Sequence, residues 1–208
     1  MKKLITILLL VAAYNLSAQE TDDLRYGFVT GLNYAHFNGS DSEQLYSRAT
    51  YQIGIYTQHK ISDNFVLQPE IILSAKGAAE DVTINQDDLI FTYKFSYIEI
   101  PILVKYYFTR SAELPVHPML FAGPAFSFRL ASELEGDLNG NTASQELTNY
   151  KTSDVGMVFG GGIGIPVGGD EISIILKYTL GFVQIDQSIS DPKDYRNGVF
   201  TIGFGYTL

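Results

Sequence analysis

The sequence predicts an all-β protein, an eight-stranded antiparallel up-and-down transmembrane β-barrel. Three observations predict it: apolar residues alternate with a period of two from Arg25 onward, the alternating segments are long, and their connections alternate between long and short. Most segments hold ten to fourteen residues. At a rise of ~3.3 Å and a tilt of ~40°, such strands span roughly 25–30 Å, the height of the apolar band of an outer-membrane barrel.

The first eighteen residues have the features of a secretory signal peptide. Lys2 and Lys3 precede ten apolar residues. Leu16-Ser17-Ala18 then resembles the small-residue motif of a cleavage site, which predicts cleavage after Ala18. Ten apolar residues fall short of the ~20 that a transmembrane helix needs. We therefore expect a signal peptide at 1–18 and one outer-membrane β-barrel domain at 19–208, with no lipid anchor because the chain contains no Cys.

The alternation divides the mature chain into eight expected strands. They cover residues 25–36, 50–61, 65–76, 92–108, 117–130, 154–167, 171–184 and 198–208. Long polar connections, at 37–49, 77–91, 131–153 and 185–197, alternate with short ones at 62–64, 109–116 and 168–170. A soluble sandwich or lipocalin-like barrel has the same period, but the strand length, the loop asymmetry and the export signal favour a closed barrel in a bilayer, where open sheet edges are forbidden.

The last eight residues, TIGFGYTL, fit the signal that closes outer-membrane barrels and is read by their assembly machinery. Its pattern is polar–x–Gly–x–x–aromatic–x–hydrophobic, which places Thr201, Gly203, Tyr206 and Leu208 in the four specified positions. Leu208 stands where Phe is usual. The sequence thus predicts two partners, the barrel assembly machinery and outer-membrane lipid.

Five stretches in order along the chain carry a family resemblance: YIEIPILVKYYF (97–108), LFAGPAFSF (120–128), GMVFGGGIGIP (156–166), LKYTLGF (176–182) and FTIGFGYTL (200–208). Through them the chain resembles the PorT-like outer-membrane β-barrel domain family of Gram-negative bacteria. The resemblance implies an eight-stranded barrel in the outer membrane. It implies no catalytic residues, and the eponymous branch is linked to protein secretion.

An eight-stranded barrel has an interior just wide enough to be filled by side chains, so we expect no diffusion pore. The alternation points the following polar residues inward: Gln52, Gln58, Gln68, Glu70, Glu99, Lys105, Arg129 and Lys177. We expect a packed polar network in which Glu70 and Glu99 pair with Lys105, Arg129 or Lys177. A proton or ion path along these residues is the alternative.

Three prolines, Pro69, Pro101 and Pro124, fall within expected strands and cannot donate to a ladder. They predict bulges, or one distorted belt where their strands are neighbours. Aromatic residues are expected to form interfacial girdles. These are Tyr26, Phe28, Tyr34, Tyr106, Tyr107, Phe108, Phe126 and Phe128.

Charge excludes some functions. Removing Lys2 and Lys3 from the 14 basic residues leaves 12 against 23 acidic ones, a net charge of −11, which argues against nucleic acid as a partner. The long connections hold 13 of the 23 carboxylates. A Ca²⁺ or Mg²⁺ bridge to lipid phosphates would suit such oxygens, but DLNGN (137–141) lacks the spacing of a known calcium loop, so we expect no metal and no cofactor.

The function predicted is therefore that of a non-catalytic outer-membrane barrel whose connections 77–91 and 131–153 touch an external or envelope partner. One alternative is an accessory component of a secretion or envelope assembly machine. The other is a lipid-modifying or hydrolytic outer-membrane enzyme, for which His36, near Ser40 and Asp41, offers the one candidate base.

Overall fold

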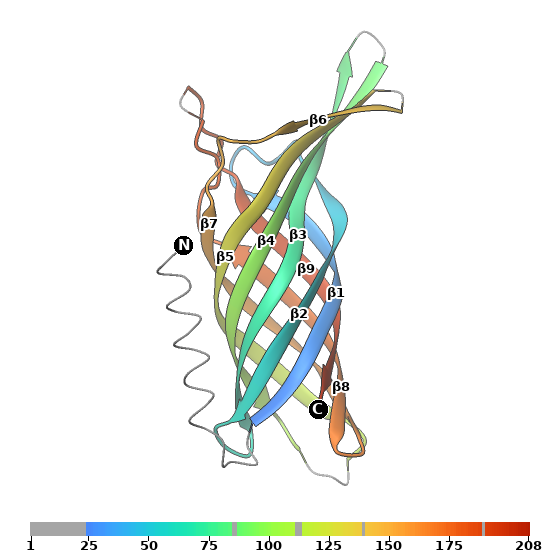
Figure 1. Ribbon diagram of the computed structural model, residues 1–208, viewed down its shortest axis with the longest axis vertical. Coiled ribbons are helices and arrows are strands. Elements are labelled where there is room, and N and C mark those ends of the chain that lie inside the picture. The colour runs from blue at the N-terminus through green and yellow to red at the C-terminus, as the bar shows by residue number, and fades with distance from the viewer. Residues whose placement is uncertain (1–23, 85–86, 111–113, 139, 189) are drawn as a thin grey trace.

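The computed structural model describes residues 24–84, 87–110, 114–138, 140–188 and 190–208, so the expected signal peptide at 1–18 lies outside the described residues. The described part is a sheet of nine antiparallel strands (Figure 1). The strands are β1 Leu24–Asn38, β2 Tyr46–Lys60, β3 Phe65–Ile84, β4 Asp87–Tyr107, β5 His117–Leu138, β6 Asn141–Glu146, β7 Ser153–Val167, β8 Asp170–Gly181 and β9 Arg196–Thr207. None of the described segments is a helix long and apolar enough to cross a membrane.

Eight of the nine strands close into a barrel. The order is β4-β3-β2-β1-β9-β8-β7-β5, and pairing of β4 with β5 completes the ring. The first and last strands meet in register from Gly27↔Thr207 to Asn38↔Arg196. Closure leaves no open edge in the wall, as a bilayer requires. The fold class expected from the sequence, an eight-stranded antiparallel barrel, is confirmed.

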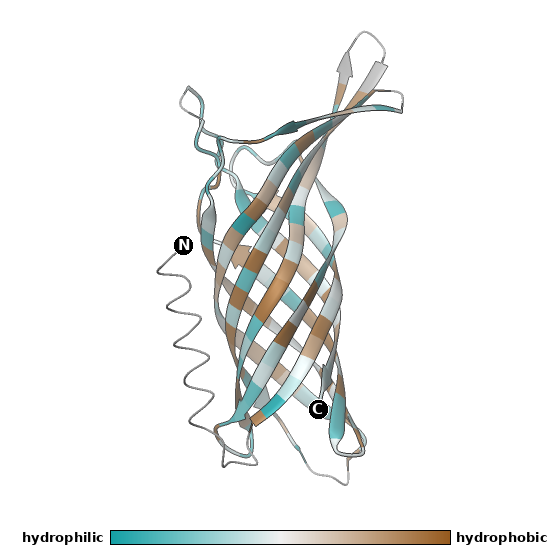
Figure 2. Cartoon of the chain, viewed as in Figure 1, coloured by the Kyte–Doolittle hydropathy of each residue, from teal (hydrophilic) through white to brown (hydrophobic). Residues whose placement is uncertain are grey.

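The two faces of the wall differ as the alternation predicts. Apolar side chains such as Leu32, 73% exposed, and Ile55, 62% exposed, cover the outside, and brown and teal segments alternate along the strands in Figure 2. In the stretch that begins at Tyr97, Ile102 and Val104 are exposed, while Glu99 is 2% exposed. An apolar belt of this extent is stable against lipid and would aggregate in water.

The prediction that residues 77–91 and 131–153 form loops is wrong, because most of these residues belong to strands. Pairing of β3 with β4 runs on to Ile84↔Asp87, and pairing of β4 with β5 runs on to Leu89↔Leu138. β6 then pairs with β5 from Glu133↔Glu146 to Leu138↔Asn141. These parts of β3, β4, β5 and β6 project beyond the barrel wall at the top of Figure 1, and we call them the extension.

Two register shifts mark the level at which the extension leaves the wall. One lies between β2 and β3, between Ser47 and Gln52, and the other between β4 and β5, between Ser96 and Tyr97. Bulges of this kind bend a strand and increase its twist. Gly77 at the same level has φ +134°, and a Cβ there would lie 1.9 Å from the Tyr93 carbonyl oxygen.

The prolines form one belt across three neighbouring strands, without a bulge. Pairing of β3 with β4 stops at Pro69↔Ile102 and resumes in the same register at Ile72↔Glu99. Pairing of β4 with β5 stops at Pro101↔Ala125 and resumes at Val104↔Ala122, which leaves a gap at Pro124. The expected distorted belt is therefore present, and the register is kept because the ladder only loses bonds.

The conformation of Gly77 gives the first testable prediction. Gly77→Ala places a methyl group against the Tyr93 carbonyl in a backbone conformation that L-residues avoid, so we expect a loss of about 1–3 kcal/mol in the free energy of unfolding. Urea unfolding from lipid vesicles measures it. Gly136→Ala is the matched control in the same extension, because its Cβ would meet Phe91 at an ordinary 3.5 Å. Equal stability of the two variants would contradict the strained position of Gly77.

Candidate functional site

The barrel interior is filled by side chains. A cavity of about 10 Å³ lies at its centre, lined in part by Glu70, Lys105 and Lys177, which is room for about one water molecule. Large apolar and aromatic residues occupy the remainder, including Leu103, Phe121 and Ile175. This arrangement is a packed core, and an open aqueous channel would need a wider barrel.

Glu99 points inward as expected, but its cation is a different one. Its carboxylate forms a salt bridge with Lys76 and accepts a hydrogen bond from Ser127 Oγ at 3.2 Å. The Lys76 ammonium also lies 5.0 Å from the centre of the Tyr97 ring. Pairing of Glu99 with Lys105, Arg129 or Lys177 was the expectation, and the salt bridge shows Lys76 instead. The signal was in the sequence, since Lys76 extends the inward series of β3 by one further alternation.

Arg129 lies at the barrel mouth and binds carbonyl groups. Its guanidinium donates to Leu147 O at 2.9 Å and to Tyr150 O at 2.8 Å, and also contacts Ser132 Oγ. The segment after β6 is thereby tied to the inner rim. Arg129 therefore positions a loop and does not neutralise Glu70 or Glu99, which corrects its expected place in the interior network.

Four of the other expected interior residues lie toward the end of the barrel with the short connections: Gln58, Gln68, Glu70 and Lys105. Glu70 accepts a hydrogen bond from Gln68, and the Lys105 ammonium lies 5.7 Å from the centre of the Tyr56 ring. Glu171, which the sequence reasoning missed, accepts a hydrogen bond from Tyr107 Oη at 3.0 Å and lies 3.2 Å from His117 Nδ1. Tyr107 is fully buried, so its expected place in a girdle is wrong.

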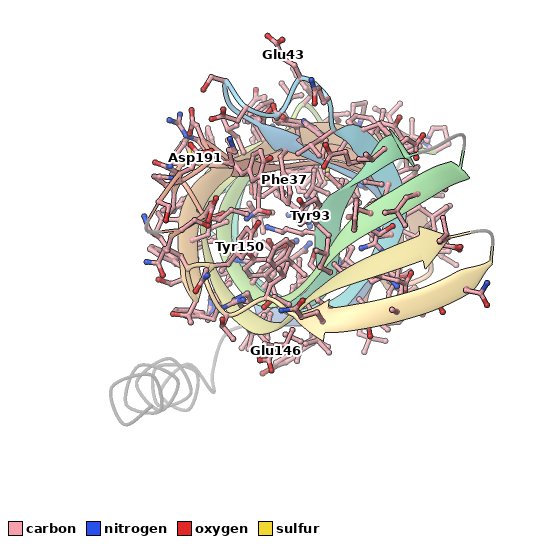
Figure 3. The ribbon with its side chains drawn as sticks, turned by 90° about the horizontal axis from the view of Figure 1, so that it is seen from above. Phe37, Glu43, Tyr93, Glu146, Tyr150 and Asp191 are labelled. Carbon is pink, nitrogen blue, oxygen red and sulfur yellow. The ribbon has the colours of Figure 1, made fainter. Side chains whose placement is uncertain are left out.

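A larger hollow opens at the end with the long connections. Its volume is about 640 Å³, and we call it the vestibule. Its lining consists of Ser40, Asp41, Glu43, Gln44, Leu45, Glu80, Tyr93, Tyr150, Asp186, Ser188, Asp191, Lys193 and Tyr195. Five of these residues carry carboxylates, against one ammonium. Seen from above in Figure 3, Phe37, Tyr93 and Tyr150 lie within the ring of strands, whereas Glu43 and Glu146 lie at its periphery.

An aromatic cluster forms the floor of the vestibule. The Phe37 ring stacks on Tyr195 with centroids 5.2 Å apart, and it meets Tyr93 edge-on at 6.2 Å. Tyr150 packs against Phe95 at 5.2 Å. These residues come from β1, β4 and two loops, and their apolar contact separates the vestibule from the charged interior below.

Two of the loops around the vestibule bind each other. Lys151 N donates to Ile185 O and Gln187 N to Asn149 O, both at 2.8 Å. The buried Asp186 carboxylate accepts from Ser188 N at 2.9 Å, Ser188 Oγ at 2.7 Å and Lys193 N at 2.9 Å. Asp186 therefore holds the second loop in shape and places a negative charge beside the aromatic floor.

Burial and nearby carboxylates raise the pKa values of two tyrosines in the floor of the vestibule. Burial, followed by the neighbouring Tyr93 and the carboxylates Glu80, Asp41 and Asp186, raises the pKa of Tyr195 to about 12. Burial, followed by the neighbouring Tyr93, Asp186 and Tyr195, also raises the pKa of Tyr150. Both phenols therefore stay neutral near pH 7, and the vestibule offers uncharged rings surrounded by carboxylates.

The geometry does not assemble the hydrolytic site considered from sequence. His36 Nε2 lies 3.1 Å from Tyr178 Oη on the outer face, and Asp41 Oδ2 accepts from the Asp194 N–H at 2.8 Å. No hydrogen bond between His36 and Ser40 is found among the described residues. The described residues also contain no group of three or more side chains suited to hold a metal ion.

Three residues of the expected assembly signal lie in β9, and Leu208 follows the strand directly. Thr201 and Gly203 are buried, Tyr206 packs its ring 5.5 Å from Phe28 and donates to Asp170, and Leu208 is 61% exposed. Leu208 N donates to Tyr26 O at 2.8 Å, so the chain is paired with β1 up to residue 208. Their role in recognition by assembly machinery stays a prediction.

The profile of a known family matches residues 17–187, most of the chain, and its description is outer membrane protein beta-barrel domain. The chain belongs to this family. It is an integral protein of the Gram-negative outer membrane, which agrees with the closed wall and its apolar outer face. No curated protein sequence matches the chain.

Several solved outer-membrane proteins are similar to this chain. Neisserial surface protein A is 15% identical with a TM-score of 0.49, over 88% of this chain and 97% of that one. Ail, the attachment invasion locus protein of Yersinia pestis, is 10% identical with a TM-score of 0.45, over 89% and 99%. OprG from Pseudomonas aeruginosa is 11% identical with a TM-score of 0.45, over 89% and 94%. Such identities carry no inference about function.

The Lys76–Glu99 pair gives the second testable prediction. Lys76→Met leaves the Glu99 carboxylate buried without its cation, so we expect a loss of about 3–5 kcal/mol in the free energy of unfolding, and Lys76→Met with Glu99→Gln should recover much of it. Urea unfolding from vesicles measures both. Glu135→Gln is the control, because its salt bridge to Lys94 is about one-third exposed and is worth less than ~1 kcal/mol. A Lys76→Met variant as stable as the control would contradict the buried pair.

Proposed function

We propose that this protein is a non-catalytic outer-membrane barrel that presents the extension as a binding surface for an extended polypeptide outside the cell. The observation that carries the proposal is the open edge of β6, which lies beyond a barrel too tightly filled to conduct. Short connections face the periplasm and long ones the exterior in outer-membrane barrels, which assigns the extension to the outside.

The hydrogen-bonding pattern defines which groups of β6 are open. Leu147 N donates to Ser132 O at 3.1 Å, which makes these two residues a hydrogen-bonded pair. Pairs alternate along an antiparallel ladder, so the N–H and C=O groups of Thr142, Ser144 and Glu146 point away from β5. All six residues of β6 are exposed, and no described strand pairs with its outer edge.

An open edge binds a partner by strand addition. Main-chain hydrogen bonds supply the affinity and neighbouring side chains the selectivity. Natural proteins commonly protect such edges with Lys, Pro or very short strands, whereas β6 is NTASQE, with neither Lys nor Pro. The carboxylates of Glu133 and Glu146, which are register partners on β5 and β6, favour a partner segment of basic character.

A photo-crosslinking amino acid at Thr142 in intact Gram-negative cells tests the proposal. We expect adducts in the parent protein and in Ser144→Ala, which keeps the outward N–H, and their loss in Ser144→Pro, which removes that N–H without breaking a bond to β5. The reconstituted parent should also show no stepwise conductance in planar bilayers. Adducts that survive Ser144→Pro, or steady open-channel steps, would contradict the proposal.

The resemblance to the PorT-like family supports a second candidate, an accessory component of a secretion or envelope assembly machine. A hollow of about 510 Å³ at the end with the short connections favours it, since Lys60, Asp63, Phe108 and Arg110 give it mixed charge and an exposed ring. Such a component would bind periplasmic proteins there. Adducts from a crosslinker at Ile61, which is 61% exposed at this end, and none from Thr142 would favour this candidate.

A further inference from the structure

We propose that the vestibule is a binding site for an organic cation, an alkylammonium or guanidinium group that enters among Tyr93, Tyr150 and Tyr195. The group belongs either to a free polyamine or to a Lys or Arg side chain of a polypeptide. The site lies at the centre of the mouth, beside the extension, and the inference holds whether or not the extension has a partner.

The size and shape of the vestibule suit such a ligand. Its volume of about 640 Å³ falls in the range of small-molecule sites, about 300–1,000 Å³. The floor is closed by the packed rings of Phe37, Tyr93 and Tyr195, so a ligand enters from outside and stops at the aromatic cluster. Two of the loops around it are fixed to each other by the hydrogen bonds of Lys151 N and Gln187 N.

The aromatic floor favours a cation over a neutral ligand. Three tyrosines reach the lining from β4 and from two separate loops. Within the described residues, none of their three hydroxyl groups donates a hydrogen bond to another side chain or carbonyl, and the rings are neutral. A cation within about 6 Å of such a ring is attracted by the negative face of the π-system, more strongly when it is desolvated.

The carboxylates make the vestibule negatively charged. The burial of one of them, Asp186, distinguishes the vestibule from an acidic patch on the surface. Asp186 is 6% exposed, and its hydrogen bonds come from neutral groups, so its charge acts on the vestibule through little water. Asp41, Glu43, Glu80 and Asp191 surround it in the lining. The one lining cation, Lys193, donates to Asp191 at 2.6 Å at the exposed side of the loop. Aromatic rings beside a buried carboxylate are the combination that recognises ammonium and guanidinium groups.

Divalent metal is a weaker occupant. No group of three suitable ligands exists among the described residues. Both Asp186 oxygens already accept hydrogen bonds from the loop, whereas Ca²⁺ takes six to eight oxygen ligands. Polyanions are excluded by the charge of the lining. A polyamine and a Lys or Arg side chain both offer what the vestibule requires, a positive group on an apolar stem that can lie on the rings.

Isothermal titration calorimetry on the refolded full-length barrel tests the proposal. The probes are spermidine for a free polyamine, an N-acetylated, C-amidated trilysine peptide for a polypeptide, and triacetylspermidine as the uncharged analogue. We expect saturable binding of one or both charged probes and none of triacetylspermidine. Binding of the peptide alone assigns the site to a polypeptide side chain, and binding of spermidine assigns it to a free polyamine.

Two pairs of variants separate the site from general electrostatics. Tyr150→Leu removes the ring face and should weaken binding about fivefold, whereas Tyr150→Phe keeps the face and should bind as the parent does. Glu80→Gln with Asp191→Asn should weaken binding at least ~fivefold. Asp63→Asn with Asp170→Asn removes the same charge at the opposite end of the barrel, outside the vestibule and the extension, and should leave affinity unchanged.

Heat-modifiable gel mobility verifies that each variant is folded before titration. The proposal is overturned if neither charged probe binds, if triacetylspermidine binds equally well, or if the Asp63 and Asp170 control weakens binding as much as the Glu80 and Asp191 variant. Unchanged affinity in Tyr150→Leu would overturn the role of the aromatic floor.

Discussion

The closure of the sheet, which pairs the backbone N–H and C=O groups of its first and last strands, is the constraint on which this structure depends. A bilayer offers no water to these groups, so a sheet can cross it only when its first and last strands meet. Here β1 pairs with β9 along twelve register positions, and β4 pairs with β5 to complete the ring. The three prolines lie in one belt, which confines their loss of ladder bonds to neighbouring strands without changing the register.

Closure with eight strands also decides the interior. The space is so narrow that inward side chains fill it, and polar ones must then satisfy each other. Lys76 and Glu99 form one such group toward the mouth, and Tyr107, His117 and Glu171 form another toward the opposite end. Aromatic residues cover the Lys76–Glu99 group, so they separate the filled interior of the barrel from the vestibule outside it.

The sequence predicted the wall well because the bilayer imposes a period of two on it. Glu70, Glu99, Lys105 and Lys177 are buried as the alternation requires. Beyond the membrane this pressure ends, so residues 77–91 resemble a polar loop although most of them are paired. The register shift opposite Arg129 likewise ends the alternation in β5, and its side chain turns to the loop. Tyr150 and Tyr195 reach the vestibule from loops, and their position depends on hydrogen bonds between distant segments that no local pattern encodes.

Spin labels placed one at a time along residues 97–108 test the central claim, a filled barrel in lipid, most directly. The absence of Cys in the chain lets single cysteines be introduced without background labelling. Collision with oxygen should be high at even positions from 98 to 108, and collision with a water-soluble nickel complex should be low at every odd position within the membrane. High nickel accessibility at odd positions would show a water-filled channel, and a loss of the period of two would contradict the barrel wall itself.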